Sequence, residues 1–372
     1  MLTGTIYVHN YAIMMHNYST KTLISNSVKV SVVGARGYTG LETARQLLKH
    51  PHVELTNCFA TTGFSLTDYI QNPKAKQVKC LTEADLMNNL TDVVFLATPA
   101  EVSLKLAPEI LKQNKKVIDL SGAFRLKKND YPTWYAFEHT QKELLQNATY
   151  GLVPFAQPVT QSNTSANALI ANPGCYASSV LMALIPLLKN NLILKDTIVI
   201  DAKSGTTGAG KKASENLLFT EVDGECLPYK IGKHQHLPEI IEAVELFTSV
   251  VINPFFTTHL LPTRRGILTS IYMKVSPNVK TSDIEKAFSQ CYANEILVQF
   301  GESEKAPQLM SLKKVVGTAK THITYHLKND QLFVFSTIDN LMKGAATQAI
   351  DNLNRLYDLP THTGLESCEA LI

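Results

Sequence analysis

A cysteine before an apolar helix is the residue of this chain best suited to nucleophilic chemistry. Cys175 ends the turn-forming residues 172–175 (NPGC), and a strongly apolar stretch follows it to about residue 189. Because proline and glycine bend the chain sharply there, we expect Cys175 at or just inside the helix N-terminus. That position favours thiolate over thiol and makes the sulfur a nucleophile. The other five cysteines lack this setting and are interpreted as small buried hydrophobic residues.

A pair of histidines supplies a candidate acid–base group. His234 and His236 lie in residues 234–239 (HQHLPE), where a proline opens the next expected helix. One imidazole of the pair fits a general acid/base near neutral pH. A metal is the alternative, but no third ligand is evident, so we predict none. Glu239 is a candidate substrate contact, or simply a negative charge at a helix N-terminus.

A glycine loop indicates dinucleotide binding. Residues 34–40 (GARGYTG) lie between an expected strand at 28–33 and an expected helix at 38–50. Glycines there let the backbone approach a pyrophosphate, and the helix N-terminus supplies N–H groups to it. A tight turn without a ligand is the alternative, since the spacing is G-x-x-G-x-x-G. The candidate cofactor contacts are Gly34, Ala35, Arg36, Gly37, Tyr38, Thr39 and Gly40.

The second expected strand, 53–59, favours NADP(H) over NAD. An NAD site usually has an Asp or Glu at the end of that strand to bind the ribose 2′-hydroxyl. Here residues 57–62 read NCFATT and contain no acid. Arg36 could instead meet a 2′-phosphate.

Three further segments carry glycine beside basic residues. Residues 203–212 (KSGTTGAGKK) form a second glycine-rich loop, in which Ser204 and Gly205 are candidate contacts for a phosphate or a nicotinamide. A flexible surface loop is the alternative. Arg125 and Arg265 each stand beside glycine after an expected strand, which suits bidentate contact with carboxylate or phosphate. Either arginine alone is more often a solvated surface charge.

Together, a thiolate, an imidazole and a dinucleotide define a narrow reaction class. The sulfur holds the substrate acyl group as a thioester, hydride is exchanged at that carbon, and the histidine manages the proton on the hemithioacetal oxygen. Anion sites nearby would suit an acyl phosphate with a distal carboxylate.

Two kinds of hydrophobic pattern must position these groups. Strands at 28–33, 53–59, 92–97 and 116–120 alternate with helices, which predicts a parallel, doubly wound α/β sheet. The second half contains an alternating strand at 267–276 and a β-hairpin, 322–327 with 332–335. Longer helices are expected there at 175–189, 237–248, 282–293 and 344–359. This part is predicted as an α+β domain with a mostly antiparallel or mixed sheet.

Composition bounds the remaining possibilities. The 372 residues suggest about two or three domains. With 45% hydrophobic residues and a net charge of +3, the chain is an ordinary globular protein, and nothing argues for nucleic-acid or membrane partners. Six widely spaced cysteines without CxxC pairs predict reduced thiols and a cytoplasmic location. Residues 1–27 are interpreted as an extension, disordered or the product of a misassigned start.

Six ordered motifs give the chain a family resemblance. They are residues 34–40, 172–176, 204–210 (SGTTGAG), 234–240 (HQHLPEI), 256–262 (FTTHLLP) and 339–346 (DNLMKGAA). Over residues 28–360 the chain resembles the long type of the N-acetyl-gamma-glutamyl-phosphate reductases of arginine biosynthesis.

The resemblance implies an architecture like that of glyceraldehyde-3-phosphate dehydrogenase. The expected parts are a Rossmann domain at 28–173, a catalytic and dimerisation domain at 174–340, and a C-terminal helix at 341–372 that returns to the first domain. A homo-oligomer, dimer or tetramer, is expected.

It also implies roles. Cys175 attacks N-acetylglutamyl 5-phosphate, NADPH reduces the thioester to the semialdehyde, and His236 is favoured over His234 as the acid/base. Arg125 and Arg265 are implied substrate-anion residues, and Asn340 is an implied nicotinamide contact.

Other functions remain open at this stage. The same chemistry fits an aspartate-semialdehyde dehydrogenase or an N-acetyl-aminoadipyl-phosphate reductase. From other classes, a thiol hydrolase or a non-catalytic NADP-sensing protein are the alternatives.

Overall fold

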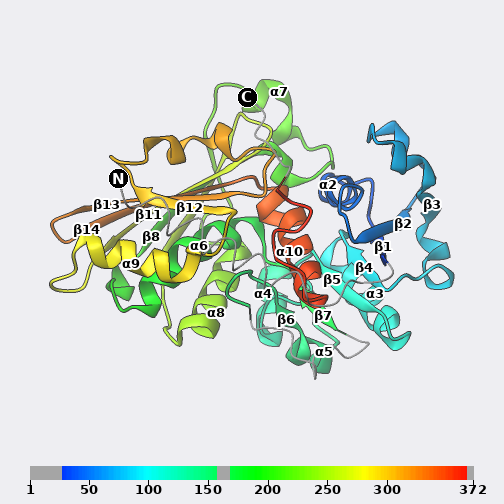
Figure 1. The fold of residues 1–372 in the computed structure, drawn as a ribbon, viewed down its shortest axis with the longest axis horizontal. Coiled ribbons are helices and arrows are strands. Elements are labelled where there is room, and N and C mark those ends of the chain that lie inside the picture. The colour runs from blue at the N-terminus through cyan, green and yellow to red at the C-terminus, as the bar shows by residue number, and fades with distance from the viewer. Residues whose placement is uncertain (1–26, 157–167, 367–372) are drawn as a thin grey trace, which may run out of the picture.

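Two seven-stranded sheets organise the chain. The computed structural model describes residues 27–156 and 168–366, so the predicted extension lies outside the described residues except for Ser27, as does Cys368. In Figure 1 the first sheet lies on the right and the second on the left, with the red C-terminal helix between them.

The first sheet is parallel throughout and has the strand order β3-β2-β1-β4-β5-β7-β6. Its strands are β1 (Val28–Val33), β2 (Val53–Ala60), β3 (Lys79–Thr82), β4 (Val93–Leu96), β5 (Lys116–Asp119), β6 (Thr149–Tyr150) and β7 (Leu169–Ala171). The accompanying α-helices are α2 (Tyr38–Leu47), α3 (Ala100–Lys112), α4 (Tyr131–Tyr135) and α5 (Lys142–Asn147). The order reverses around β1, which places the loop after β1 at a ligand-binding edge of such a sheet.

The second sheet is mixed, with the order β12-β13-β14-β11-β8-β10-β9. Its strands are β8 (Val199–Gly205), β9 (Leu227–Tyr229), β10 (Phe255–Leu261), β11 (Ile267–Lys274), β12 (Val298–Glu302), β13 (Thr321–Lys328) and β14 (Gln331–Ile338). Its α-helices are α6 (Cys175–Lys189), α7 (Phe219–Val222), α8 (His236–Thr248) and α9 (Thr281–Tyr292). β8 pairs with β10, and β12 with β13, in parallel, while the other pairs are antiparallel.

The predicted fold class is confirmed. The hairpin appears as β13 and β14, with Asn329 in the left-handed conformation at its turn. The expected helix at 344–359 instead begins as a π-helical turn, Met342–Ala346, and continues as α10 (Thr347–Leu356). The strand character of β8 was missed because Asp201 and Lys203 interrupt its apolar pattern.

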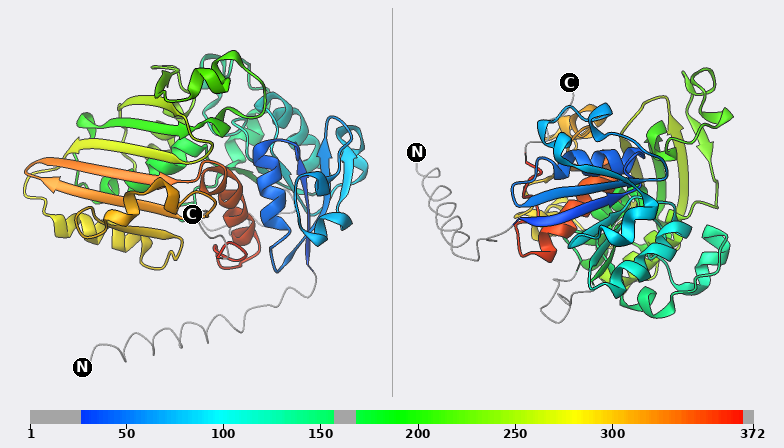
Figure 2. Two further views of the ribbon diagram at one scale, coloured as in Figure 1. Left: turned by 90° about the horizontal axis from the view of Figure 1, so that it is seen from above. Right: turned by 90° about the vertical axis from the view of Figure 1, so that its right-hand side faces the viewer.

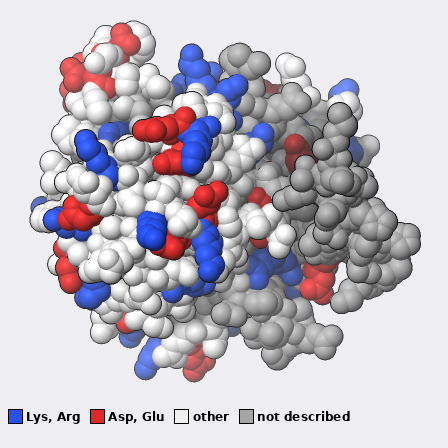
Figure 3. Space-filling view, turned by 60° about the vertical axis from the view of Figure 1, so that its left-hand side comes forward, with Lys and Arg blue, Asp and Glu red and all other residues white. Residues whose placement is uncertain are grey.

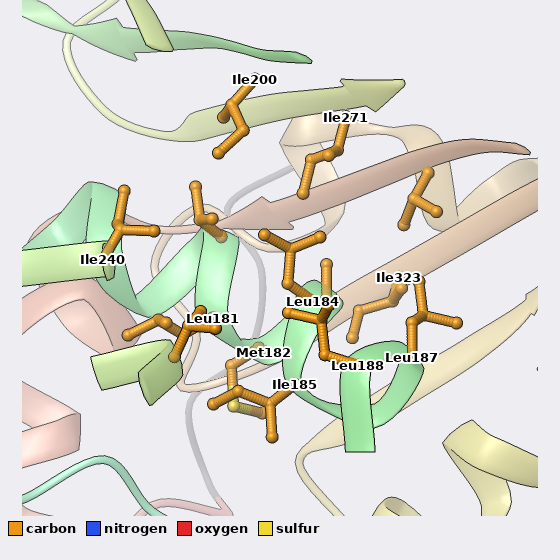
Figure 4. Close-up of a cluster of buried hydrophobic side chains, with 14 of the residues drawn as sticks. Leu181, Met182, Leu184, Ile185, Leu187, Leu188, Ile200, Ile240, Ile271 and Ile323 are labelled. Atoms are coloured by element: carbon orange, nitrogen blue, oxygen red, sulfur yellow. The ribbon is translucent and has the colours of Figure 1, made fainter. Parts of the chain in front are cut away.

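Helix α6 is the centre of the second domain. Residues 176–188 of this helix are buried on every side, because the sheet covers one side and α8 and α9 cover others. Figure 4 shows Leu181, Leu184 and Leu187 of α6 among isoleucines of the sheet and of α8. All three leucines are fully buried. This packing fixes the helix whose first residue is Cys175.

Helix α10 joins the end of the chain to the first domain. Ile350 and Leu353 of α10 belong to the same buried cluster as Val30 and Val32 of β1. The view from above in Figure 2 places the helix between the two sheets. The loop that precedes α10 therefore connects the second sheet with the first domain.

The described surface agrees with the small net charge of the sequence. On the face in Figure 3, lysines and arginines are interspersed with acidic residues. Within residues 27–156 and 168–366, no helix is both long and apolar enough to cross a bilayer.

Shortening a core side chain of α6 should cost stability. Leu184→Ala removes a fully buried side chain, so the free energy of unfolding should fall by about 2–5 kcal/mol. Leu246→Ala on α8 is the matched control, because Leu246 is 64% exposed. Urea denaturation measures both variants. Equal losses would contradict the central role of α6 packing.

Candidate active site

One cleft brings together groups from both domains. It has a volume of about 1260 Å³. Its walls include Gly37, Tyr38 and Thr39 from the first domain. They also include Arg125, Cys175, Ser204, Gly205, His234, His236 and Asn340. Most of the residues singled out from sequence therefore face one space.

Cys175 is the first residue of α6, as predicted, and Gly174 is its N-cap. The expected preference for thiolate is not what the electrostatics show. Burial raises the pKa of the Cys175 thiol to about 11, and the nearby charge of Arg125 lowers it only in part. Cys175 does lie at the helix N-terminus, but the cost of desolvating a negative sulfur outweighs the stabilisation that this position gives to the thiolate. In this structure Cys175 is a thiol at neutral pH.

His236 lies against the backbone just before Cys175. A Cβ on Gly174 would be 2.3 Å from Nε2 of His236, so only glycine leaves room for the imidazole. Burial, followed by the charges of Arg125 and Lys230, holds the pKa of His236 well below its usual range. Cys175 and His236 line the same cleft, where a neutral imidazole can accept the proton of a thiol.

His234 contacts the backbone and the ring of His236. Its Nδ1 accepts a hydrogen bond from the backbone N–H of His236 at 3.1 Å, and the two ring centroids are 4.7 Å apart. Burial lowers the pKa of His234 to about 2, so it is neutral. The geometry suits a residue that positions His236.

Glu239 is behind the cleft rather than in its lining. Its side chain is fully buried, and Oε1 accepts hydrogen bonds from the N–H of Gly174 at 2.7 Å and from the hydroxyl of Tyr150 at 2.8 Å. Its Oε2 lies 3.6 Å from Nη1 of Arg125 and 4.0 Å from Nε2 of His236. These contacts differ from the substrate-binding expectation and suit a residue that holds the site together.

Arg125 is one of the residues that line the cleft. Nε donates to the carbonyl of Asn172 at 2.8 Å and Nη2 to that of Leu120 at 2.7 Å. These two bonds fix the guanidinium plane, while Nη1 is near Glu239 at ion-pair distance. Arg125 therefore has a fixed charge on the wall next to Cys175.

Arg265 does not line the cleft. Nε and Nη2 contact the carboxylate of Asp339, and Nη1 contacts Glu42 at 2.9 Å. The guanidinium faces two carboxylates, so the structure departs from the substrate-anion role expected for Arg265.

The glycine loop divides into residues that shape the turn and residues that face the cleft. Gly34 has φ +77°, and a Cβ there would lie 2.3 Å from the carbonyl oxygen of Ala97. Gly40 packs as closely against Gly34, and Ala35 is buried. Gly37 is the N-cap of α2, where no side chain caps the helix. An uncapped helix start that opens into a cleft fits a pyrophosphate.

Arg36 is exposed beside the end of β2. Its Nη1 donates to the hydroxyl of Thr62, one of the residues that follow that strand. This is the location expected for a contact with the 2′-phosphate.

The second glycine loop is tied to Asn340. The side chain of Asn340 accepts from the N–H of Gly266 at 2.8 Å and donates to Oγ1 of Thr207 at 3.0 Å. Ser204 and Gly205, at the end of β8, lie in the same wall.

Sequence reasoning missed several cleft residues. Tyr229 and Lys230 line the cleft, and their place shortly before the histidine pair could have drawn attention to them. Lys211, in the second glycine loop, also lines the cleft, and its Nζ lies 5.5 Å from the ring centroid of Tyr38 and 4.9 Å from that of Tyr69. Among the described residues, no group of three or more His, Cys, Asp or Glu could hold a metal ion.

Comparison with known proteins identifies the family. Residues 29–163 match the family described as "Semialdehyde dehydrogenase, NAD binding domain", and residues 175–340 match "Semialdehyde dehydrogenase, dimerisation domain". The N-acetyl-gamma-glutamyl-phosphate reductase of Staphylococcus epidermidis is 37% identical over 343 residues, which cover 90% of this chain and 97% of that protein. The chain belongs to the N-acetyl-gamma-glutamyl-phosphate reductase family. The reductase of Bacillus mycoides is 38% identical, with 91% of this chain and 98% of that protein covered.

Solved structures agree with this family at the level of the fold. Aspartate semialdehyde dehydrogenase II of Vibrio cholerae superposes with a TM-score of 0.69 at 17% identity, covering 90% of this chain and 99% of that one. The Candida albicans aspartate semialdehyde dehydrogenase with NADP gives 0.61 at 14% identity, with 90% and 99% covered. Family membership confirms the predicted resemblance and the predicted class, an oxidoreductase with a nicotinamide-dinucleotide domain.

Adding one methyl group at Gly174 should lower the rate of catalysis without affecting dinucleotide binding. Gly174 has φ −70° and ψ 155°, which alanine adopts without strain, yet its Cβ would displace the His236 ring. Gly174→Ala should lower kcat by about tenfold or more and leave dinucleotide binding unchanged. Steady-state kinetics and fluorescence titration measure the two effects. A fully active variant would contradict the placement of His236.

The raised pKa of Cys175 predicts how alkylation depends on pH. Only the thiolate reacts with iodoacetamide. The observed alkylation rate of Cys175 should therefore increase about tenfold per pH unit from pH 7 to beyond pH 9. Mass spectrometry of the Cys175 peptide follows it, with the peptide of exposed Cys226 as a control for reagent and digestion. A plateau near pH 7 would show a stable thiolate and contradict the dominance of burial.

Proposed function

We propose that the chain catalyses NADPH-dependent reduction of N-acetyl-L-glutamyl 5-phosphate to N-acetyl-L-glutamate 5-semialdehyde and phosphate, in arginine biosynthesis. The observation that carries this proposal is a single cleft that holds Cys175 at a helix start, His236 beside it, and the uncapped start of α2. The names of the relatives supply the substrate.

The chain's own groups account for the acyl transfer. His236 accepts the thiol proton of Cys175 as the sulfur attacks the acyl carbon. The C–S bond forms, the bond to the phosphate oxygen breaks, and phosphate leaves beside the positive charge of Arg125. The carboxylate of Glu239 stabilises the imidazolium, since its Oε2 lies 4.0 Å from Nε2 of His236.

The dinucleotide fits the wall formed by α2 and the second glycine loop. When bound, it supplies hydride to the thioester carbon. Gly37, Tyr38 and Thr39 would hold its pyrophosphate, and Ser204, Gly205 and Asn340 would face its nicotinamide end. His236 gives its proton to the hemithioacetal oxygen. The C–S bond then breaks as His236 takes this hydroxyl proton back and passes it to the sulfur, so that the aldehyde leaves and the Cys175 thiol is restored.

NADP(H) is favoured over NAD by the end of β2. No acid follows this strand in residues 60–63, and Arg36 stands there with Thr62. An arginine in that place can bind a 2′-phosphate, whereas a ribose hydroxyl would call for a carboxylate.

We further propose a homo-oligomer, dimer or tetramer, in the cytoplasm. Helices α6, α8 and α9 pack on one face of the second sheet (Figure 1). The match to a dimerisation domain and the 77% exposed Phe255 at the start of β10 support association through the other face. The proposed domain boundaries are 28–173, 174–340 and 341–372, supported by the end of the first sheet at Ala171 and of the second at Ile338.

The proposal is tested in the reverse direction. Purified protein should reduce NADP⁺ in the presence of phosphate and N-acetylglutamate semialdehyde, and Cys175→Ala should abolish this turnover. Dinucleotide binding by the variant should be nearly unchanged, because Cys175 is assigned to the acyl group. Activity is followed by absorbance of NADPH.

Three substrates discriminate between the alternatives. Preference for aspartate semialdehyde, or for the acetylated aminoadipate semialdehyde, would overturn the substrate assignment. Turnover that persists in Cys175→Ala would overturn the thioester mechanism.

A further inference from the structure

We propose that Arg265 is a positioning residue that sets the width of the cleft by bridging the two domains. The Arg265 bridge consists of Glu42, Arg265 and Asp339. This inference rests on the proposed function, since it assigns a role in dinucleotide use to a residue that is not itself part of the cleft lining.

The three members come from three distant parts of the chain. Glu42 lies on α2, Arg265 follows β10, and Asp339 follows β14. Nη1 of Arg265 donates to Oε2 of Glu42 at 2.9 Å. On the other side, Nε lies 2.9 Å from Oδ2 of Asp339, and Nη2 lies 3.0 Å from Oδ1. One planar guanidinium therefore joins the first domain to the second.

Burial makes the bridge a firm contact. The side chain of Asp339 is fully buried and that of Glu42 is 6% exposed, so neither carboxylate is well solvated. Arg45 also contacts Glu42, at 2.8 Å. The positive charges of the two arginines therefore balance the negative charges of the two carboxylates. No surplus positive charge is left to attract a substrate anion.

Each end of the bridge lies directly behind one wall of the cleft. Tyr38 and Thr39, one turn before Glu42, line the wall assigned to the pyrophosphate. Asp339 accepts hydrogen bonds from the N–H groups of Leu341 and Met342, and its neighbour Asn340 faces the nicotinamide end. The bridge therefore fixes the distance between the two dinucleotide-binding walls.

A second feature couples the bridge to the wall. A Cβ on Gly205 would lie 2.7 Å from the backbone nitrogen of Arg265, and the next residue, Gly266, donates its N–H to Asn340. A shift of Arg265 would therefore move Gly205 and Asn340 together. Since a dinucleotide must contact both walls at once, small errors in their separation lower its productive binding.

The sharpest variant is Glu42→Gln. It removes the charge on the first-domain side and leaves the Arg265–Asp339 pair intact. Arg265→Lys is the second variant, because lysine keeps the charge but lacks the planar fork that contacts two carboxylates. Glu109→Gln, in an exposed pair with Lys112, and Arg264→Lys, at an exposed neighbour, are the matched controls.

We expect kcat/KM for NADPH to fall by about tenfold or more in both variants. The KM for N-acetylglutamyl phosphate and the alkylation rate of Cys175 should stay within about twofold of the wild type. The double variant should lose less than the sum of the two single effects, since both act on one contact. The controls should behave as wild type in each measurement.

Three results would overturn the inference. One is a rise in the KM of the acyl phosphate with unchanged use of NADPH, which would make Arg265 a substrate ligand. Another is a lower melting temperature with unchanged kinetics, which would make the bridge a purely structural contact. The third is wild-type kinetics and stability in both variants.

The binding constant for NADPH alone separates this inference from the proposed function. If the wild type binds NADPH but does not turn over the acetylated substrate, the substrate assignment fails. The comparison of binding constants between wild type and Glu42→Gln still decides the role of the bridge.

Discussion

The contacts of the buried Glu239 carboxylate are the interactions on which the geometry of the site depends. This carboxylate accepts the N–H of Gly174 directly before the nucleophile and lies near both Arg125 and His236. Through it, the start of α8 is held against the start of α6. An uncompensated charge at this depth would be costly, so the carboxylate and Arg125 depend on each other. The fold thus fixes sulfur, imidazole and guanidinium as one unit.

Burial also sets the protonation state of that unit. It raises the pKa of Cys175 and lowers the pKa of His236, so both groups rest in their neutral forms. Charge then develops only when the sulfur attacks and the proton moves to the imidazole. Fixed charges in a dry site stabilise such developing charge more strongly than they would in water. The arrangement suits acyl transfer from a substrate that itself brings a phosphate and a carboxylate.

The parts of the site that depend on residues close together in the chain could be predicted from the sequence. The turn before Cys175, the glycine loop after β1 and the hairpin of β13 and β14 follow rules that operate over a few neighbouring residues. The roles of Arg265 and Glu239 do not. Arg265 meets Glu42, which is 223 positions away in the chain, and no local pattern shows that partner. The pKa of Cys175 escaped prediction for the same reason, because desolvation depends on the whole fold around the helix start.

The covalent intermediate tests the central claim most directly. The protein is mixed with N-acetylglutamyl phosphate in the absence of dinucleotide, quenched in acid and measured as an intact mass. The account predicts an increase equal to one N-acetylglutamyl group, located on Cys175 by peptide mapping and absent in Cys175→Ala. Release of phosphate from the acyl phosphate without any adduct on Cys175 would contradict it.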